Sequence, residues 1–522
     1  MKKFLHFLLV YLSIRNFTKA LDFGSFQPEI TLSVTGAPSG RLGYSMSNAG
    51  DIDNDGYDDI IIGAYSINQA FLVYGKEDLD PASVSILVTT LDPATTGFTI
   101  TGSTASDQLG FSVSGAGDVN QDGYDDIIVG APGAISNKGA AYVIYGGAKA
   151  SMMHIALSTT SLKHLTTGFT ITGSVVDDKL GSSVSGAGDL NKDGYDDVIV
   201  GAPYASSNKG AAYVIYGGAK SSLLDLDLSS STTVLDPHAN GFVITGNAAG
   251  DWLGAAVSGG GDINKDQYDD IIIGAYNKGG MQGAAYVIYG GAKSSMASIY
   301  LSSSALNPST NGFTITGGAQ TGLGGSVSNA GDINNDGYDD LVIGALYQNS
   351  FQGAVFVIYG GGTNSDIDFS TGTTLDPAST GFTISTTGNA AFSYFGYAIN
   401  SAGDLNKDGY DDIIIGAYAV NSNMGAAYVV YEGEKYNLPN REFSSSSAFD
   451  PKTTAFSILE NTSPSSLGMS VGLCDFNNDG FSDILIGASG GSSGGTAYIL
   501  VYRKLLYFFI ITFSIRTMPC KL

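Results

Sequence analysis

The chain contains only two cysteines, Cys474 and Cys520, among its 522 residues. Cys474 lies inside a repeated motif, where we expect it to be a small apolar filler, and Cys520 lies close to the C-terminus. Two cysteines cannot form the framework of bridges that stabilises disulfide-rich secreted domains. Disulfides are therefore excluded as the main stabilising element of the fold.

Histidine and positive charge are scarce as well. The four histidines, His6, His154, His164 and His238, do not recur at equivalent positions, and no arrangement of nucleophile, base and orienting group is recognisable. This favours a protein that is not an enzyme; the alternative is a secreted hydrolase or lyase on the same scaffold. Lys and Arg number 24 against 49 Asp and Glu, which gives a net charge of −25. Such a charge repels phosphate backbones, so nucleic acid is not an expected partner.

Long hydrophobic runs are also missing. Lys2 and Lys3 precede an apolar stretch of eleven residues, Phe4–Ile14, and Thr18 and Ala20 stand at −3 and −1 relative to a cut before residue 21. This pattern predicts a secretory signal peptide over residues 1–20 and a secreted or cell-surface protein.

A second apolar run, Leu505–Ile515, falls in the C-terminal tail, residues 504–522. It is too short for a comfortable transmembrane helix. Two alternatives remain open for it, a membrane-associating tail and an error in the gene model. The sequon Asn461-Thr462-Ser463 predicts a glycoprotein if the host is a eukaryote.

Glycine is abundant, at 72 residues, and one repeated unit fills residues 21–503. The clearest copy reads LGFSVSGAGDVNQDGYDDIIVGAP from Leu109 to Pro132. Seven copies are present, and the aspartates that open their loops are 67 to 73 residues apart. These aspartates are Asp51, Asp118, Asp189, Asp262, Asp332, Asp404 and Asp475.

Each unit contains four strand-like runs. In the second copy they are Phe98–Gly102, Phe111–Gly115, Ile127–Ala131 and Ala141–Gly146. The third run is apolar throughout, as expected of a strand buried on both faces. We therefore predict an all-β fold, a seven-bladed β-propeller of four-stranded antiparallel blades. Because the last unit lacks one strand, the N-terminal run Ile30–Gly36 should complete it and close the ring.

The nine-residue loop of each unit carries the chemistry. In the second copy, oxygen side chains stand at positions 1, 3, 5 and 9, Gly123 at position 6 allows a positive φ, and the carbonyl at position 7 can turn inward. Several carboxylates and no sulfur or imidazole predict Ca²⁺, up to seven ions in total. The alternative is an Asx-rich turn that binds no ion. It could account for a single loop of this kind, but seven equivalent loops with the same oxygen pattern argue against it.

The predicted calcium ligands occupy positions 1, 3, 5, 7 (backbone) and 9 of each loop. They are Asp51, Asp53, Asp55, Tyr57 and Asp59; Asp118, Asn120, Asp122, Tyr124 and Asp126; Asp189, Asn191, Asp193, Tyr195 and Asp197; Asp262, Asn264, Asp266, Tyr268 and Asp270; Asp332, Asn334, Asp336, Tyr338 and Asp340; Asp404, Asn406, Asp408, Tyr410 and Asp412; and Asp475, Asn477, Asp479, Phe481 and Asp483.

Two further details of the loops lead to expectations. Gln267 replaces the position-6 glycine, so a residue with a Cβ must hold a positive φ, and the Asp262 loop should be the weakest site. The aspartate at position 8, such as Asp125, is left without a role by this scheme and is expected to be a solvated neighbour.

Aromatic residues mark the opposite face of the predicted ring. Loops between the second and third strands of a blade share this face with the loops that lead into each new blade. Trp252, Tyr204, Tyr276 and Tyr418 are the candidate contact residues for an extracellular protein or glycan ligand. The alternative is that these rings plug the centre of the propeller.

The repeats resemble FG-GAP repeats, the units of the integrin α-subunit propeller, from about Ile30 to Tyr502. The two halves of the motif stand as Phe395-Gly396 and Gly130-Ala131-Pro132, although Leu-Gly replaces Phe-Gly in most copies. The resemblance implies calcium at the aspartate loops of the lower face and ligand recognition by the upper face. No integrin-like leg domains follow and no phospholipase domain precedes the repeats, so pairing with an integrin β-subunit is not expected.

Overall fold

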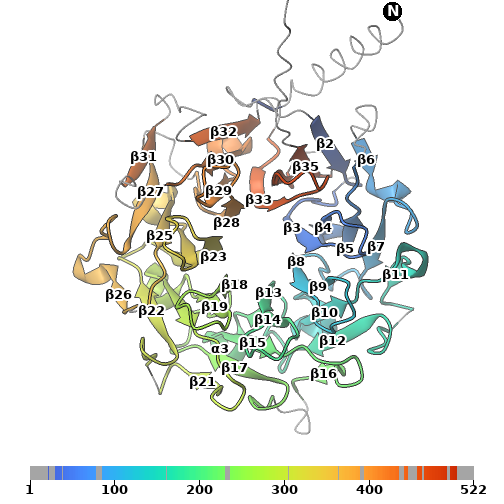
Figure 1. The fold of residues 1–522 in the computed structure, drawn as a ribbon, viewed down its shortest axis with the longest axis horizontal. Coiled ribbons are helices and arrows are strands. Elements are labelled where there is room, and N and C mark those ends of the chain that lie inside the picture. The colour runs from blue at the N-terminus through green and yellow to red at the C-terminus, as the bar shows by residue number, and fades with distance from the viewer. Residues whose placement is uncertain are drawn as a thin grey trace, which may run out of the picture.

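The computed structural model describes residues 21–22, 30–37, 39–77, 85–159, 161–229, 235–303, 305–362, 364–387, 393–433, 440–444, 455–460, 464–490 and 494–501. In this part of the chain seven sheets stand around a central axis, which confirms the predicted seven-bladed all-β propeller (Figure 1). The predicted signal peptide, the C-terminal tail and the sequon at Asn461 lie outside the described residues. Among the described residues, no helix combines the length and apolar character needed to cross a bilayer.

Each blade contains four antiparallel strands. The innermost strands are β3 (Ser45–Gly50), β8 (Ser112–Gly117), β13 (Ser183–Gly188), β18 (Ala256–Gly261), β23 (Leu323–Gly331), β28 (Ala398–Gly403) and β33 (Leu467–Cys474). The second strands are β4 (Asp59–Ala64), β9 (Asp126–Ala131), β14 (Asp197–Ala202), β19 (Asp270–Gly274), β24 (Asp340–Ala345), β29 (Asp412–Ala417) and β34 (Asp483–Ala488). The third strands are β5 (Gln69–Val73), β10 (Ala140–Ile144), β15 (Ala211–Ile215), β20 (Ala284–Ile288), β25 (Ala354–Ile358), β30 (Ala426–Val430) and β35 (Thr496–Val501).

The fourth strand of each blade comes from the next unit along the chain. These strands are β7 (Gly97–Thr101), β12 (Gly168–Thr172), β17 (Gly241–Thr245), β22 (Gly312–Thr316), β27 (Gly381–Thr387), β32 (Ala455–Glu460) and, in the last blade, β2 (Ile30–Thr35). Strand β2 pairs antiparallel with β35 over six residues, from Ile30 opposite Val501 to Thr35 opposite Thr496. The predicted closure of the ring by the N-terminal strand is therefore confirmed.

A fifth, short strand at the outer edge of each blade was not expected. The fifth strands are β11 (Ile155–Ala156), β16 (Leu226–Asp227), β21 (Ile299–Tyr300), β26 (Ile367–Asp368), β31 (Arg441–Ser444), β1 (Leu21–Asp22) and β6 (Ser85–Leu87). Strand β11 belongs to the connection between β10 and β12 of the second blade but pairs, in parallel, with β7 of the first. The connections that contain β16, β21, β26, β31 and β6 likewise fasten their own blade to the preceding one, whereas β1 precedes β2 in the chain and pairs antiparallel with β32.

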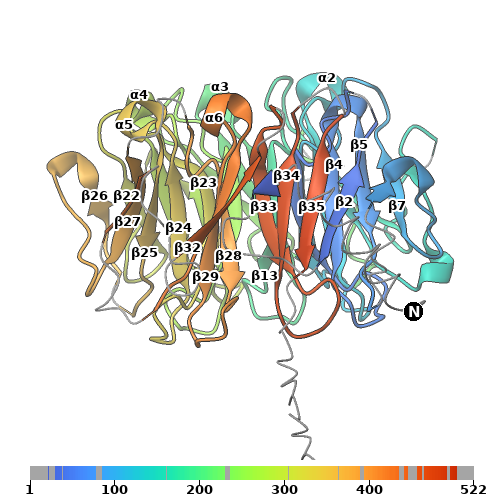
Figure 2. The same ribbon diagram turned by 90° about the horizontal axis from the view of Figure 1, so that it is seen from above.

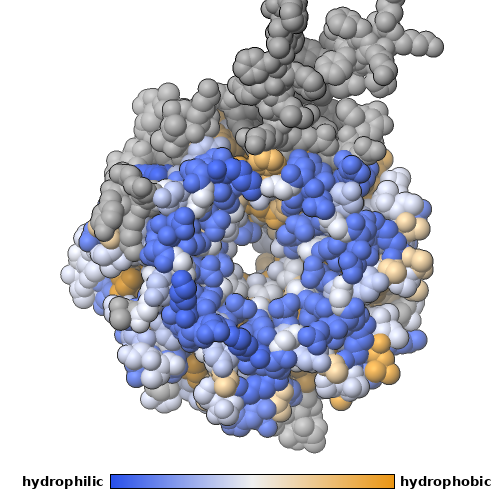
Figure 3. All heavy atoms as spheres, in the orientation of Figure 1, coloured by the Kyte–Doolittle hydropathy of each residue, from blue (hydrophilic) through white to orange (hydrophobic). Residues whose placement is uncertain are grey.

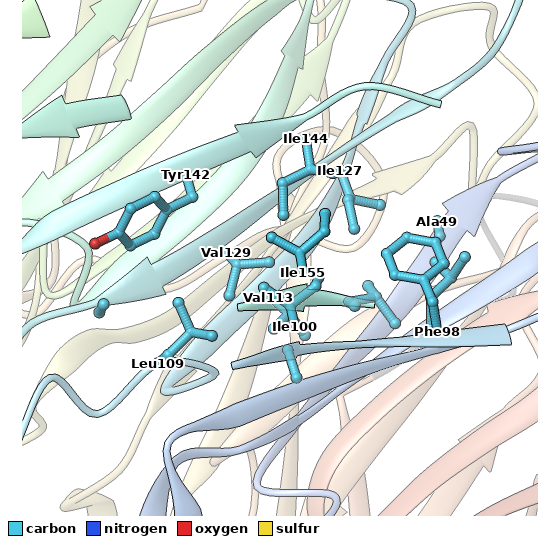
Figure 4. Packing of buried hydrophobic residues seen from close by; sticks show 14 of the residues in the cluster. Ala49, Phe98, Ile100, Leu109, Val113, Ile127, Val129, Tyr142, Ile144 and Ile155 are labelled. Atoms are coloured by element: carbon cyan, nitrogen blue, oxygen red, sulfur yellow. The ribbon is translucent and has the colours of Figure 1, made fainter. Parts of the chain in front are cut away.

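The core lies between the blades. Strand β9, like the other second strands, is buried along its whole length, as the continuous apolar run predicts. Phe98 and Ile100 of the first blade pack with Ile127 and Val129 of the second in one of seven such clusters (Figure 4). Burying a side chain of this size contributes about 1.5–3 kcal/mol. The seven inter-blade clusters thus provide most of the hydrophobic stabilisation of the ring.

The two faces of the ring differ in their connections. Short helices follow the second strands and lie together at one end, at the top of Figure 2. They are α2 (Ala134–Asn137), α3 (Ala205–Asn208), α4 (Lys278–Met281), α5 (Gln348–Phe351) and α6 (Val420–Asn423). The nine-residue aspartate loops join the first and second strands and so lie at the other end. Figure 3 shows that one face of the ring is mostly hydrophilic around a central opening.

Candidate functional site

The aspartate loops fold around their own carboxylates. In the loop between β8 and β9, the two carboxylate oxygens of Asp118 accept the backbone N–H groups of Asp122 (3.1 Å) and Gly123 (2.8 Å). Asp122 Oδ1 accepts the N–H of Tyr124 at 3.3 Å. The Asp189, Asp332 and Asp404 loops repeat the two bonds of position 1. Positions 1 and 5 therefore set the bend that gathers the oxygen atoms.

Position 9 supplies a fully buried carboxylate. Asp126 Oδ2 accepts the N–H of Val119 at 3.1 Å, and Oδ1 accepts the N–H of Gly146 at 2.9 Å. Burial raises the pKa of Asp126 well above its usual range, and Asp122 and Asp118 nearby raise it further. Burial likewise raises the pKa of Asp59 to about 9 and that of Asp270 to about 8. Negative charge at this position is therefore disfavoured unless a positive charge stands beside it.

Position 3 leaves oxygen atoms without a hydrogen-bond donor in four loops. Asp53 Oδ1 and the side-chain oxygens of Asn120, Asn191 and Asn334 are buried and accept no hydrogen bond, and these residues are at most 7% exposed. Leaving a buried acceptor unpaired costs about 1–3 kcal/mol. In the first loop, ligand oxygens of Asp51, Asp53 and Asp55 all lie within 4.8 Å of one another. An orphaned buried oxygen beside clustered carboxylates fits a hard divalent cation such as Ca²⁺.

The remaining three loops use the position-3 oxygen internally. The side-chain oxygens of Asn264, Asn406 and Asn477 accept the N–H of the position-5 aspartate at 2.8, 2.9 and 3.1 Å. The seven loops thus share ligand types but differ in whether position 3 already has a donor. Sequence comparison of the repeats gave no sign of this difference, because asparagine stands at position 3 in six of them.

The expectation for position 8 is wrong. Asp125 Oδ2 accepts the N–H of Asp51, the first residue of the loop in the preceding blade, at 2.8 Å. The corresponding bonds are Asp196 to Asp118, Asp269 to Asp189, Asp339 to Asp262, Asp411 to Asp332 and Asp58 to Asp475, at 2.8 to 2.9 Å. These aspartates therefore link neighbouring blades instead of being solvated, and the last unit has Ser482 in their place. Their recurrence in six units is the signal that could have indicated a role.

The candidate contact residues of the opposite face come together. Tyr204, Trp252, Tyr276 and Tyr418 all line one cavity of about 600 Å³. The ring of Trp252 lies 5.8 Å from that of Tyr204 and 5.4 Å from that of Tyr276. Burial, helped by neighbouring tyrosines, raises the pKa of Tyr418 to about 12. These rings therefore border one cavity together, and their role as ligand contacts stays a prediction.

Further aromatic residues line this cavity. Tyr44, Tyr347, Tyr394 and Tyr397 also line it, and Tyr394 stacks on Tyr418 with ring centres 5.3 Å apart. They come from both kinds of upper-face loop, which meet only after the blades close into a ring.

The repeats match a known family. The FG-GAP repeat profile fits residues 42–74, 109–144, 180–215, 323–358, 395–430 and 467–500. This is an FG-GAP repeat protein. The chain is 32% identical to integrin alpha pat-2 of Caenorhabditis elegans over 254 residues, 46% of this chain and 18% of that protein. It is 29% identical to mouse integrin alpha-8 over 244 residues, 46% of this chain and 20% of that protein.

A third relative covers more of the FG-GAP protein. The phosphatidylinositol-glycan-specific phospholipase D of Bos taurus is 27% identical over 439 residues, 78% of this chain and 47% of the relative. The chain thus spans about a fifth of the length of the integrin α relatives and about half that of the phospholipase.

Two glycines of the FG-GAP motif touch across the blade interface. A Cβ on Gly130, from the GAP half, would lie 2.1 Å from the carbonyl oxygen of Gly181, from the LG half of the next unit. Gly181 has a φ of +83° and donates its N–H to the carbonyl of Gly201 at 3.0 Å. The motif therefore marks the closest approach of two blades, which only residues without a Cβ allow.

The unit that the family profile does not match is the fourth, which carries Gln267. Gln267 holds the predicted positive φ, +75°, and its N–H still bonds to Asp262 Oδ2 at 2.8 Å. The loop therefore keeps the same bend as the others, but the backbone of Gln267 is strained because its Cβ disfavours the left-handed conformation. That this loop binds its ion most weakly stays a prediction.

Two of the histidines have structural partners. His154 Nδ1 accepts the N–H of Thr99 at 3.1 Å, and His238 Nδ1 lies 2.7 Å from the carbonyl oxygen of Lys293. Both bonds involve the backbone of another unit, so these imidazoles hold connections to the blades.

Proposed function

We propose that this FG-GAP protein is a calcium-binding adhesion or recognition module, secreted or at the cell surface, that binds an extracellular protein or glycan through its upper-face cavity. The observation that carries the proposal is the cavity of about 600 Å³ lined by Trp252, Tyr276 and their aromatic neighbours. Aromatic side chains offer large apolar area with a polar edge, and they dominate the binding energy of many recognition surfaces.

The calcium part of the proposal rests on the lower face. Up to seven ions would be held by the aspartate loops, each by side-chain oxygens of positions 1, 3, 5 and 9 and the carbonyl of position 7. A bound ion would supply the positive charge that the buried position-9 carboxylates and the orphaned position-3 oxygens call for. Extracellular sites of this kind bind with dissociation constants on the order of 10⁻⁴–10⁻³ M. Similarity to integrin α subunits supports both the cation and the extracellular ligand.

The test is an array of glycans and extracellular-matrix proteins, probed with purified protein in Ca²⁺ and in chelator. Trp252→Ala should weaken binding to any ligand found by at least about 2 kcal/mol, because it removes a ring at the cavity wall. Tyr300→Ala is the matched control, since Tyr300 lies on the outer edge strand β21 and is 52% exposed. Equal binding by both variants, with unchanged melting temperatures, would place recognition elsewhere.

A second candidate is a secreted hydrolase or lyase, favoured by the similarity to a phospholipase over 78% of this chain. The same array distinguishes the two. Stable, saturable binding without product supports the recognition module, whereas released product without a retained complex supports the enzyme.

A further inference from the structure

Three lysines from equivalent positions reach the aspartate loops of the preceding blade. Lys149, Lys220 and Lys293 each end a Gly-Gly-Ala-Lys segment that follows the third strand of a unit. Lys149 Nζ lies 2.9 Å from Asp53 Oδ2 and also contacts Asp55. Lys220 Nζ lies 2.5 Å from Asp122 Oδ2, and Lys293 Nζ lies 2.5 Å from Asp193 Oδ2. The first three loops thus each hold an ammonium group at position 5.

Each ammonium takes the carboxylate oxygen that the loop itself leaves free. Oδ1 of Asp55, Asp122 and Asp193 accepts the backbone N–H of position 7 at 3.2 to 3.3 Å. Oδ2 accepts no hydrogen bond from the loop, which makes it the more open oxygen for a cation, and Oδ2 is the atom that the lysine contacts. A calcium ion bound to this oxygen at about 2.3–2.6 Å would stand within a few ångströms of the ammonium. Two positive charges at that separation repel strongly in a partly buried site.

An aromatic ring holds each lysine in place. The Nζ atoms of Lys149, Lys220 and Lys293 lie 4.8, 5.0 and 5.0 Å from the ring centres of Tyr74, Tyr145 and Tyr216. Each tyrosine directly follows the third strand of one blade, and the lysine side chains are only 28–29% exposed. Attraction to the ring face adds to the ion pair. The lysines are therefore fixed next to the loops and are not free surface charges.

The fourth loop offers the natural contrast. The equivalent segment that would reach it follows the third strand of the fifth unit and reads Gly360-Gly361-Gly362-Thr363, with threonine at the lysine position, which lies outside the described residues. A cavity of about 370 Å³ borders Asp266, Tyr289 and Gly362, where the ammonium stands in the other three loops. Among the described residues, no lysine or arginine forms an ion pair with Asp266. Position 5 is thus open to solvent in this loop.

We propose that Lys149, Lys220 and Lys293 act as built-in counter-cations that compete with the divalent ion for the first three loops. Without the divalent ion, the ammonium neutralises the position-5 carboxylate and keeps the loop folded. With it, the ammonium must leave, which lowers the affinity of these three loops relative to the same loops without a lysine. The inference rests on the proposed calcium sites and adds that their affinities are graded by the chain itself.

The test compares a triple variant, in which the three lysines become methionine, with the wild type and with the triple arginine variant. Calorimetric titration with Ca²⁺ alone, at about 0.15 M salt to screen distant charges, should give about tenfold higher affinity for three sites of the methionine variant. Its melting temperature should be lower than that of the wild type in chelator and at least equal in saturating Ca²⁺. The arginine variant keeps the charge and should resemble the wild type.

Lys138→Met is the control for net charge, because Lys138 caps helix α2 at the end of the ring opposite the loops; it should leave calcium affinity unchanged. Equal affinity in the methionine variant and the wild type would overturn the competition while leaving the calcium sites standing. A methionine variant that fails to fold in saturating Ca²⁺ would also overturn it, since the ion should then replace the ammonium. If the wild type binds no Ca²⁺, both this inference and the calcium part of the proposed function fall.

Discussion

The bond between neighbouring blades can be tested by adding one methyl group. Gly117 precedes the second aspartate loop at a φ of +67°, and a Cβ there would lie 2.2 Å from Asp196 Oδ2. That oxygen accepts the N–H of Asp118 at 2.8 Å, so Gly117→Ala must displace it and break the bond. Losing a hydrogen bond to a charged acceptor costs about 1.5–3 kcal/mol, and the left-handed conformation adds about 1 kcal/mol for alanine. We expect a total loss of about 3 kcal/mol.

Gly403 provides the matched control. It holds the same place before the sixth loop at a φ of +49°, but its added Cβ would meet only Ser482 Oγ, at 3.5 Å. Gly403→Ala should therefore show the conformational cost alone, about 1 kcal/mol. The difference of about 2 kcal/mol between the two variants is the contribution of the aspartate bond.

Equilibrium unfolding in urea, in saturating Ca²⁺, measures both free energies of unfolding. The double variant Gly117→Ala, Asp196→Ser recreates the natural arrangement of Gly403 and Ser482. Because Asp196→Ser already removes the bond, adding Gly117→Ala should cost only about 1 kcal/mol more. Equal losses in Gly117→Ala and Gly403→Ala, or additive losses in the double variant, would refute the proposed link between blades.

Four other outcomes are expected. Chelation of Ca²⁺ should lower the melting temperature of the wild type markedly, because the loop carboxylates then repel one another; an unchanged melting temperature contradicts the calcium sites. Asn334→Ala should weaken one calcium site by about tenfold in a calorimetric titration, and Asn406→Ala by less, since the Asn406 oxygen already accepts a hydrogen bond. Gln267→Gly should raise the calcium affinity of the fourth loop, because glycine holds the positive φ of this position without strain. If a crystal structure of the wild type shows calcium at equal occupancy in all seven loops, this ranking is wrong. The pKa of Tyr418 is near 10 in the unfolded chain and about 12 in the folded protein, so its contribution to stability is complete below pH 10 and is lost between pH 10 and 12. The melting temperature of Tyr418→Phe should therefore depend less on pH in that range than that of the wild type. An equal dependence would contradict the raised pKa.

The repeats made most of the fold predictable. Strands such as Ile127–Ala131 are continuous apolar runs bounded by glycine, and seven copies with one strand missing at the end require closure by Ile30–Thr35. The short edge strands were not predictable, because two residues such as Ile155 and Ala156 have no periodicity to read. Their pairing depends on how the connections cross from one blade to the next.

The loop ligands could be read from the sequence because all of them lie within nine residues. Asp125 and Lys149 could not be placed, because each acts on a loop that lies more than sixty residues earlier in the chain. Their partners are neighbours only after two blades pack side by side. The aromatic residues of the opposite face were easier, because the propeller prediction already places the loops of Trp252 and Tyr418 on one face, where both line one cavity.

The pairing of β2 with β35 also constrains how the protein is made. Ile30–Thr35 leaves the ribosome early, yet its partner Thr496–Val501 is synthesised more than 460 residues later. Until then the first blade faces solvent where the last should pack, and β2 displays unpaired backbone groups. Closure of the ring therefore waits for a docking step that no earlier segment can replace, and a circular permutation that joins β2 directly to β35 should remove this delay.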